Sequence, residues 1–378
     1  MEFFFIFYIL VESEILAIIK ITRANKPPLK GEEDQRSWWR GLYFKIKNLN
    51  NIKGEKIMYN NVRLEKGLYH LSDKSFTEAL EALDPSSQYA DTPLAKLDAY
   101  ERQLKRFDIR ISGADCDRVE KFFTSTESAV LFPEFIRRAI RQGIDSCALS
   151  DISAVQTICS SSQYLGCTIS DDASYDTVTA QKGTLPVTEI TEQTSPLSLN
   201  KYARAVHISY EAVRRQRLDV LAVMLRSVGV KLGNAIIKAA VGVLKTGAGS
   251  SAAAAGDSFA YGDLAALCGK FKDFSLNTVL ASPQVLAGIL TMDQMLESSS
   301  ENPGEAMLPF GARLIKTAQL DDDTIIGIDK DFALEMVTGT DLIMETDKLI
   351  DSQLNTITIS VQTGFRTIMK DAVHILTK

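Results

Sequence analysis

The sequence is poor in the residues that catalysis and metal binding use most. Its 378 residues include three histidines and five cysteines, and no two cysteines have a C-x-x-C spacing. Histidine is a common acid–base and metal-binding side chain, and structural zinc sites bring cysteines in close pairs. An odd number of scattered cysteines also argues against a disulfide framework and favours a reducing compartment. The composition therefore leans away from an enzyme, a metal site and a disulfide-stabilised fold.

A surplus of positive charge is missing too. The chain has 42 Lys plus Arg against 48 Asp plus Glu, for a net charge of -6. Proteins that bind nucleic acid broadly neutralise phosphates with clustered lysines and arginines, so the net charge argues against a general nucleic-acid binder. The length and the 45% hydrophobic content are sufficient for a sizeable core in one elaborate or two ordinary domains.

The chain does not begin with a long apolar run. The stretch Phe3–Val11 covers nine residues, whereas a membrane-spanning helix needs about 20, and the basic start and cleavage site of a signal peptide are missing. Residues 1–57 carry a net charge of +3 and both tryptophans. The codons AAA GGA GAA AAA ATT ATG would encode Lys53 to Met58 and contain a purine-rich ribosome-binding sequence. We therefore expect an over-extended leader at 1–57 and a start at Met58, with a disordered or amphipathic arm as the alternative.

Helical periodicity dominates the next part of the chain. Apolar residues at spacings of three and four predict two short amphipathic helices between Phe76 and Arg110, joined by a loop at residues 84–87. Another helix is expected from Leu131, with Pro133 in its first turn, to a stop before Gly143. The polar segment 157–207 predicts instead a long projecting β-hairpin with strands at Val187–Thr191 and Ala203–Ser209. Such a hairpin buries little of itself and needs a binding partner.

The most regular pattern predicts a long core helix over Tyr210–Leu244, followed by a flexible loop at residues 246–256. Downstream, helices and strands alternate, which indicates a mixed α+β body. The expected helices are Tyr261–Phe271 and one that Ser282-Pro283 caps and that runs to Met295; the expected strands are Asn277–Ala281, Thr324–Ile328, Leu334–Val337, Ile357–Val361 and a last apolar alternation through Val373 and Ile375.

No motif for chemistry stands in its required context. The glycines of Gly247-x-Gly249-x-x-Ala252 follow a predicted helix rather than a strand, so they do not predict a nucleotide site. Asp321-Asp322-Asp323 lacks the alternating ligands and the turn glycine of a calcium loop and is interpreted as a solvated turn.

Nucleophilic catalysis has equally weak candidates. Ser209 lies near His207 and Asp371 near His374, but no G-x-S-x-G is present. We interpret the three histidines as ordinary structural residues and the cysteines as small buried hydrophobes. We expect no catalytic, cofactor-binding or metal-binding residues and no cofactor. The cysteines and histidines are Cys116, Cys147, Cys159, Cys167, Cys268, His70, His207 and His374.

The order of these elements resembles the major capsid proteins of tailed phages, which have the Hong-Kong-97-like fold. That family has an N-terminal arm, an extended β-hairpin loop, a long spine helix, and peripheral and axial domains. The resemblance covers about residues 76–378 and depends on the order of several segments. They are Ser125-Thr126-Glu127-Ser128-Ala129-Val130-Leu131-Phe132-Pro133-Glu134-Phe135-Ile136, residues 191–202, Ser282-Pro283, residues 347–351 and residues 358–365.

The resemblance implies a domain plan and a function. A helical arm or scaffold-like segment is expected at 58–124, and a peripheral domain at 125–257 with an extended loop at about 160–206 and a spine helix at about 212–245. An axial domain follows at 258–345, and the chain returns to the peripheral domain at 346–378. The implied function is self-assembly into pentamers and hexamers of an icosahedral virion capsid around double-stranded DNA. Assembly is expected in the host bacterial cytoplasm, without a membrane and with portal and decoration proteins as further partners.

Four alternatives stay open at this stage. Some family members cross-link a lysine of the extended loop to a neighbouring subunit, and Lys182 is the lysine near the expected tip, although an ordinary structural lysine is favoured. Residues 58–124 are either a retained arm or a cleaved scaffolding segment. An encapsulin-like nanocompartment that loads a cargo enzyme shares the fold. A hydrolase would require Ser209 or His374 in a pocket.

Overall fold

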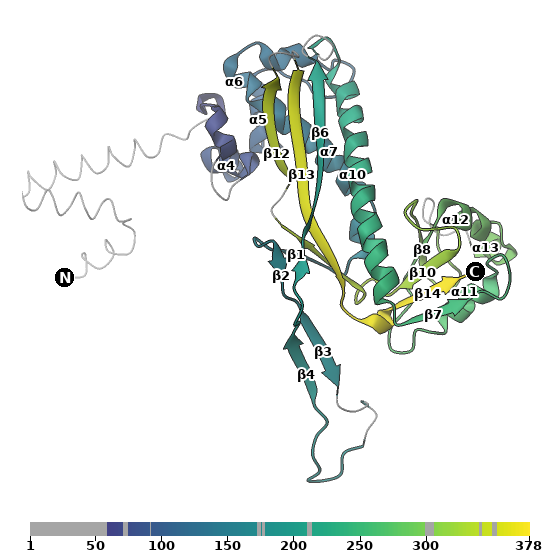
Figure 1. Ribbon diagram of the computed structural model, residues 1–378. Coiled ribbons are helices and arrows are strands. Elements are labelled where there is room, and N and C mark those ends of the chain that lie inside the picture. Colours follow the sequence, from purple (N-terminus) through teal and green to yellow (C-terminus); the bar gives the residue numbers. More distant parts are fainter. Residues whose placement is uncertain are drawn as a thin grey trace, which may run out of the picture. The chain divides into compact units, whose positions relative to one another are not determined.

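The computed structural model describes residues 59–70, 75–90, 92–171, 175, 178–209, 214–298, 306–339, 342–349 and 354–378 (Figure 1). Contacts divide the chain into Met1–Met58 and Tyr59–Lys378, and the described residues all belong to the second unit. The expected leader at 1–57 therefore lies outside the described residues.

Short helices form the first part of the described chain. Two of them confirm the predicted amphipathic pair: α4 (Phe76–Leu83) and α5 (Ala99–Arg106) each begin with a capping box, from Ser75 and Asp98. The others are single 3-10 turns, η1 (Tyr59–Asn61), η2 (Lys66–His70), η3 (Ser86–Tyr89) and η4 (Val119–Phe123).

Three further helices connect this region to the first strand: α6 (Thr126–Ala129), α7 (Leu131–Asp145) and α8 (Leu149–Ile152). The prediction that α7 stops before Gly143 is wrong, since the helix continues for two residues beyond that glycine. Gly143 is needed where α7 crosses α10 (Leu218–Gly247), because a Cβ there would lie 2.2 Å from the carbonyl oxygen of Arg226. The glycine therefore marks a close helix crossing and not a helix end.

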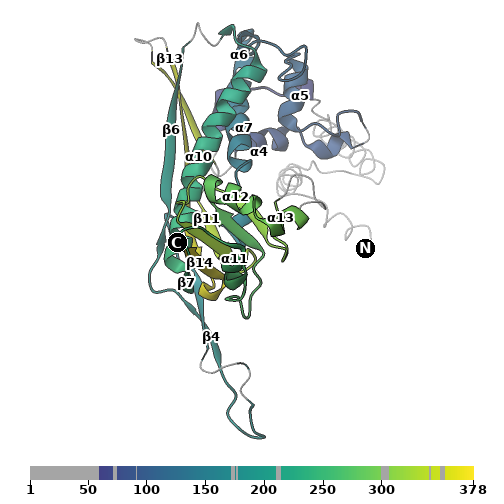
Figure 2. The same ribbon diagram turned by 90° about the vertical axis from the view of Figure 1, so that its right-hand side faces the viewer.

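The long helix α10 spans 30 residues, or about 45 Å. It confirms the predicted core helix, although it begins at Leu218, and residues 210–213 of the prediction lie outside the described part. By length and composition it is the one helix in the described ranges that could cross a membrane, a criterion that core helices of soluble proteins also meet. It packs along α7 and along the strands β6 (Asn200–Ser209) and β13 (Leu354–Thr367), as Figures 1 and 2 show.

The crossing of α7 and α10 gives a first prediction. Gly229→Ala is expected to lower the free energy of unfolding by about 1–3 kcal/mol, because its Cβ would lie 2.1 Å from the carbonyl oxygen of Ile140. Gly242→Ala, on the same helix with no atom within 4 Å of the added Cβ, is the matched control and is expected to stabilise by up to about 1 kcal/mol. Equilibrium denaturation of both variants measures the difference. Equal effects would show that the crossing tolerates a side chain.

One five-stranded sheet, here called the first sheet, contains β13 at its centre. β13 pairs antiparallel with β6 along ten residues, and β12 (Ile343–Leu349) pairs antiparallel with the other edge of the same part of β13. Further along the chain, β13 pairs antiparallel with β11 (Leu334–Thr338). β11 in turn pairs in parallel with β1 (Val155–Ile158). The strand predicted at Ile357–Val361 is confirmed as the middle of β13, and Ile357 and Ile359 are buried there.

The predicted hairpin pairing is wrong, although both of its strands exist. The strand near Val187–Thr191 is β4 (Thr188–Glu192), and it pairs with β3 (Cys167–Asp171) rather than with β6. The strand near Ala203–Ser209 is β6, whose ladder partner is β13. The projecting hairpin is therefore β3–β4, and a two-residue ladder of β2 (Gln163–Tyr164) and β5 (Leu197–Ser198) lies between it and the first sheet.

A second sheet has the order β7-β14-β10-β8-β9. Its members are β7 (Ser250–Ala253), β14 (Val373–Thr377), β10 (Thr324–Ile328), β8 (Thr278–Ala281) and β9 (Arg313–Lys316). The flexible loop predicted at 246–256 is partly wrong, because β7 pairs in parallel with β14. Serine and alanine are weak strand formers, so the ladder to the buried β14 overrides their local preference.

The helices beside the second sheet are α11 (Tyr261–Cys268), α12 (Pro283–Leu290) and α13 (Asp293–Ser298). Ser282 caps α12 as predicted, with its Oγ accepting from the Val285 amide at 3.2 Å. The helix ends at Leu290 rather than at Met295 and restarts at Asp293.

Two apolar cores support this arrangement, which confirms the predicted mixed α+β fold. The larger core joins the N-terminal helices, α7, α10, the first sheet and second-sheet residues such as Ile326 and Val373. The smaller core lies between α11, α12 and the second sheet. The domain boundaries expected at 125, 258 and 346 stay a proposal.

Candidate functional site

The structure does not assemble the candidate catalytic residues. Ser209 ends β6 in the first sheet, whereas His374 lies in β14 of the second sheet. His207, also on β6, is exposed, and its Nδ1 lies 3.0 Å from Oγ1 of Thr356 across the ladder. Among the described contacts, neither His207 nor His374 forms a hydrogen bond with Ser209.

His374 has a structural environment. Its Nδ1 lies 2.8 Å from Oγ of Ser250, its ring meets Phe271 edge-on at 4.6 Å, and its buried Nε2 has no partner among the described groups. Burial lowers the pKa of His374, Lys270 acts in the same direction, and Asp371 opposes them. A neutral imidazole that joins β7 to β14 fits these contacts.

The cysteines are all free, but they are less buried than expected. Cys167 is exposed and the other four are half-buried, so the expectation of buried thiols is wrong. Burial and the neighbouring Asp145 raise the pKa of Cys147, which keeps that thiol protonated. Within the described ranges no three His, Cys, Asp or Glu side chains gather as a metal site.

The three aspartates of residues 321–323 lie in an exposed turn, as expected, and each has a different partner. Asp321 pairs with Nζ of Lys245 at 2.7 Å, and Asp322 accepts from the capping hydroxyl of Ser282 at 2.5 Å. Asp323 accepts from Thr324. The turn therefore joins the end of α10 to the start of α12 through separate hydrogen bonds.

Close packing explains Gly247, the last residue of α10, and Gly249, which follows the helix. A Cβ on Gly247 would lie 2.0 Å from Oγ1 of Thr367, and one on Gly249 would lie 2.7 Å from Oδ1 of Asp371. The space beside Gly249 thus faces a carboxylate, which disfavours a phosphate there.

The hairpin β3–β4 has little internal support. All ten of its strand residues are exposed, and the cross-strand pair Ile169 and Ile190 is 40% and 71% exposed. A two-stranded hairpin is at best marginally stable by itself. The hairpin is therefore a surface that gains stability by burial against another molecule.

Charge and turn geometry add to this description. Residues 160–199 include five acidic residues and one cation, Lys182. Lys182 is exposed with a positive φ of 69°, and the Gly183 amide closes the turn on the Ala180 carbonyl at 2.8 Å. No contact tests the cross-linking role that the family resemblance raises for Lys182.

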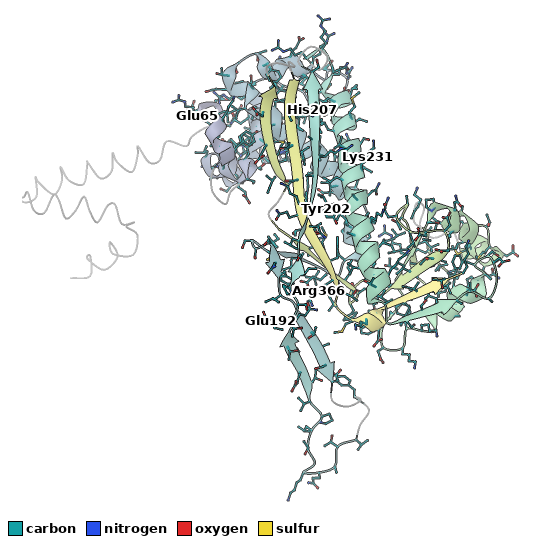
Figure 3. All side chains as sticks on the ribbon, viewed as in Figure 1. Glu65, Glu192, Tyr202, His207, Lys231 and Arg366 are labelled. Carbon is teal, nitrogen blue, oxygen red and sulfur yellow. The ribbon has the colours of Figure 1, made fainter. Side chains whose placement is uncertain are left out.

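A charged cluster that the sequence did not predict lies at the base of the hairpin, and Figure 3 labels one of its members, Arg366. Its centre is the carboxylate of Glu335 on β11, which is 4% exposed. Three donors from different strands bind it: Thr157 Oγ1 at 2.5 Å, Tyr164 Oη at 2.9 Å and Arg366 Nε at 2.5 Å. These four residues are here called the base cluster.

The hydrogen bonds of the base cluster control its ionisation. Burial acts to raise the pKa of Glu335, but the bonds from Thr157, Arg366 and Tyr164 outweigh burial and hold the pKa below its usual range. Burial and the bond to Glu335 raise the pKa of Tyr164, which keeps its hydroxyl a donor. Glu335 is therefore a carboxylate at neutral pH.

A pH prediction follows from the lowered pKa of Glu335. A carboxylate whose pKa is lower in the folded state stabilises the fold above its unfolded pKa of about 4.3 and loses that contribution as pH falls through the folded pKa. The difference in melting temperature between the native chain and Glu335→Gln is expected to be constant above about pH 5 and to shrink below about pH 4. Melting curves across this range measure it. A difference that grows on acidification would contradict the assignment.

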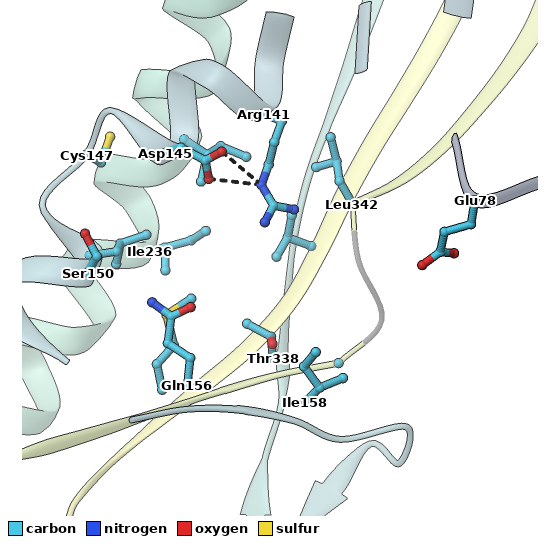
Figure 4. A pocket seen from close by; sticks show the side chains of 15 residues that line it. Glu78, Arg141, Asp145, Cys147, Ser150, Gln156, Ile158, Ile236, Thr338 and Leu342 are labelled. Atoms are coloured by element: carbon cyan, nitrogen blue, oxygen red, sulfur yellow. Dashed lines mark hydrogen bonds and ion pairs between the residues drawn. The ribbon is translucent and has the colours of Figure 1, made fainter. Parts of the chain in front are cut away.

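A pocket of about 680 Å³ lies between α7, α8 and the first sheet (Figure 4). Its apolar lining includes Ile144, Ile236 and Met336, and Arg141 Nε binds both oxygens of Asp145 at 2.9 and 3.3 Å. The fifteen lining residues include no histidine, and the lining thiol of Cys147 is protonated as described above. Among the described lining residues there is therefore no serine–histidine or cysteine–histidine pair.

The N-terminal helices are built into the main core. The ring of Phe122 lies 5.5 and 5.7 Å from those of Phe132 and Phe135 on α7, and Tyr69 Oη donates to the Val130 carbonyl at 2.7 Å. Leu80 is fully buried in the same core. Removal of this region would expose a large apolar face of α7.

The chain has limited similarity to known proteins. Residues 192–368 match the family of phage capsid proteins, and the chain matches no curated protein. The solved structure of a virus-like particle from Pyrococcus furiosus is similar at 14% identity, 64% of this chain, 98% of that chain and a TM-score of 0.47. The capsid of a native GTA particle is similar at 13% identity, with 61% of this chain and 89% of that chain covered and a TM-score of 0.48. The structure of Microbacterium phage Oxtober96 is similar at 13% identity, with 61% of this chain and 90% of that chain covered and a TM-score of 0.47.

Proposed function

From its resemblance to the major capsid proteins of tailed phages, with their Hong-Kong-97-like α+β fold, we propose that this chain assembles into pentamers and hexamers. These capsomers close an icosahedral shell around double-stranded DNA. The virion capsid is its destination, and the host bacterial cytoplasm is the place of assembly.

The observation that carries this proposal is the exposed hairpin β3–β4. Its ten strand residues are exposed, and the connecting loop adds Leu185 at 71% exposure. A second copy of the chain supplies the missing surface, because the rotations that relate the subunits of a closed shell repeat the same contact at every subunit. Burial of the paired isoleucines on a neighbour then stabilises hairpin and shell together.

The charge of the chain supports a container rather than a nucleic-acid binder. A net charge of -6 does not attach packed DNA to the wall of the shell. Portal and decoration proteins are the further partners in this proposal, and it includes no catalytic residue and no cofactor.

The arm is proposed to stay in the mature subunit. Phe122 and Leu80 contribute to the core that contains α7 and α10, so a cut within 76–124 would remove part of that core. A cleaved scaffolding segment, the other open alternative, would need to leave without unfolding the remainder. The peripheral and axial domains at 125–257, 258–345 and 346–378 belong to the same proposal.

Electron microscopy of the purified chain tests the proposal. The full 378-residue chain and a chain that starts at Met58 are expressed in bacteria, and the particles are separated on a density gradient. Closed icosahedral shells, either empty or with double-stranded DNA protected inside them, support the proposed function. Shells that instead enclose a protein cargo would favour the nanocompartment alternative, and a monomer under all assembly conditions would contradict both.

A further inference from the structure

The hairpin β3–β4 leaves the first sheet through a narrow base. Two backbone hydrogen bonds close that base: the Gln193 amide donates to the Gly166 carbonyl at 2.8 Å, and the Leu199 amide donates to the Ser162 carbonyl at 3.1 Å. Between them lies only the two-residue ladder of β2 and β5. So short a ladder does not by itself fix the direction of the hairpin.

Arg366 of β13 lies directly against this base. Its Nη1 donates to the Cys167 carbonyl, the first residue of β3, at 2.8 Å. The guanidinium also fills the space beside Gly166, where a Cβ would lie 2.3 Å from Cζ. Figure 3 labels Arg366 close to the point where the hairpin begins. A single side chain of the first sheet therefore contacts both residues at the start of the hairpin.

Glu335 fixes that guanidinium in place. It accepts from Arg366 at 2.5 Å while it holds Thr157 on β1 and Tyr164 on β2. The base cluster thus connects β1, β2, β11, β13 and the first residue of β3. Charge-assisted hydrogen bonds to a planar guanidinium are directional, whereas apolar contacts between the same strands would hold them together without fixing an angle.

We infer that the base cluster is a positioning device that sets the direction of the hairpin relative to the first sheet. The inference rests on the proposed function, because a direction matters only when the hairpin must reach a fixed place on a neighbouring subunit. Glu335 and Arg366 are its two central residues.

The length of the hairpin explains why the angle must be fixed. From Cys167 to Lys182 an extended chain reaches at most about 50 Å. A rotation of about 10° at the base would then move the tip by about 9 Å, close to two strand spacings. An error of that size would place the exposed isoleucines and Leu185 on the wrong surface of the neighbour.

The test is a double variant that replaces the ion pair by an apolar pair, Glu335→Met with Arg366→Met. Replacement of a buried ion pair by apolar side chains of similar volume is often neutral for stability, so the melting temperature is expected to be close to that of the native chain. In unassembled subunits the amides of Gln193 and Leu199 are expected to exchange hydrogen about tenfold faster. Shells are expected to be rare or uneven in diameter. Asp321→Asn, which removes the ion pair to Lys245 outside the base cluster, is the control and is expected to change none of these.

The three readouts separate the possible failures. Shells of native diameter and yield from the double variant would overturn the inference, and so would native exchange rates at the two amides. If the unchanged chain formed no shells at all, the proposed function would fail instead, whatever the exchange rates of the variant. Faster hydrogen exchange at the Gln193 and Leu199 amides, together with defective shells and native thermal stability, is the result that supports the inference.

Discussion

Removal of the hairpin is expected to leave a folded subunit that forms no shells. Cys167 and Glu192 are ladder partners, so residues 168–191 can be replaced by a two-residue Asn-Gly turn that joins them. Because the removed strands are exposed, the free energy of unfolding is expected to change by no more than about 0.5 kcal/mol. Shell yield on a density gradient is expected to fall to background. Denaturation curves and electron microscopy measure the two effects.

A variant that keeps the hairpin is the matched control. Lys182→Gly retains both strands and suits the positive φ at this position, so native shells are expected. The same variant tests whether Lys182 forms cross-links. If native shells are cross-linked through Lys182, they resist boiling in detergent, and shells of Lys182→Gly lose that resistance. Normal shells from the chain without its hairpin would show that assembly uses another surface.

Loss of Arg102 is expected to have the largest effect on stability. This guanidinium is fully buried and donates to the Asp84 carboxylate, the Asp84 carbonyl and the Leu97 carbonyl, each at 2.6 Å. Among the described residues, Arg102→Met would leave the buried carboxylate of Asp84 with one side-chain donor, the hydroxyl of Tyr89 at 2.6 Å. Breaking a buried pair in this way costs about 3–5 kcal/mol. Calorimetry and denaturant titration measure the loss.

The control for this variant is a similar pair on the surface. Arg63 and Glu65 form an ion pair at 2.9 Å with both side chains largely exposed, so Arg63→Met is expected to change stability very little. Because the arm shares its core with α7 and α10, Arg102→Met should lower the melting temperature of the whole described unit in one transition. A separate early transition of the arm, with an unchanged main transition, would contradict the proposal that the arm is an integral part of the subunit.

The sequence predicted those elements whose pattern is local. Helical spacing predicted α4, α5 and α10, and the strands expected at Asn277–Ala281 and Thr324–Ile328 are β8 and β10 at nearly the same bounds. Gly143 was misinterpreted as a helix end, because a glycine that permits a close helix crossing has the same local appearance as one that stops a helix. The residue that makes Gly143 a crossing point is Gly229 of α10, which is 86 residues further along the chain, so the sequence around Gly143 does not reveal it.

Long-range pairing could not be predicted from the same pattern. The polar segment 157–207 indicated a hairpin with strands near 188 and 204, yet β4 and β6 pair with different partners. The base cluster was missed for the same reason: Thr157 and Glu335 are 178 residues apart, and Tyr164 and Glu335 are 171 apart. The signal that was present is the placement of Glu335 within the largely apolar, buried strand β11, where an ionisable side chain needs a partner.

The most direct measurement of the central claim is a reconstruction by cryo-electron microscopy of particles assembled from the purified chain. The account predicts a closed icosahedral shell of pentamers and hexamers. In it the hairpin β3–β4 of each subunit lies on a neighbouring subunit, Ile169 and Ile190 are buried there, and Glu335 still binds Arg366 at the base. A shell in which the hairpins extend freely into solvent, or a protein that stays monomeric under every assembly condition, would contradict the account.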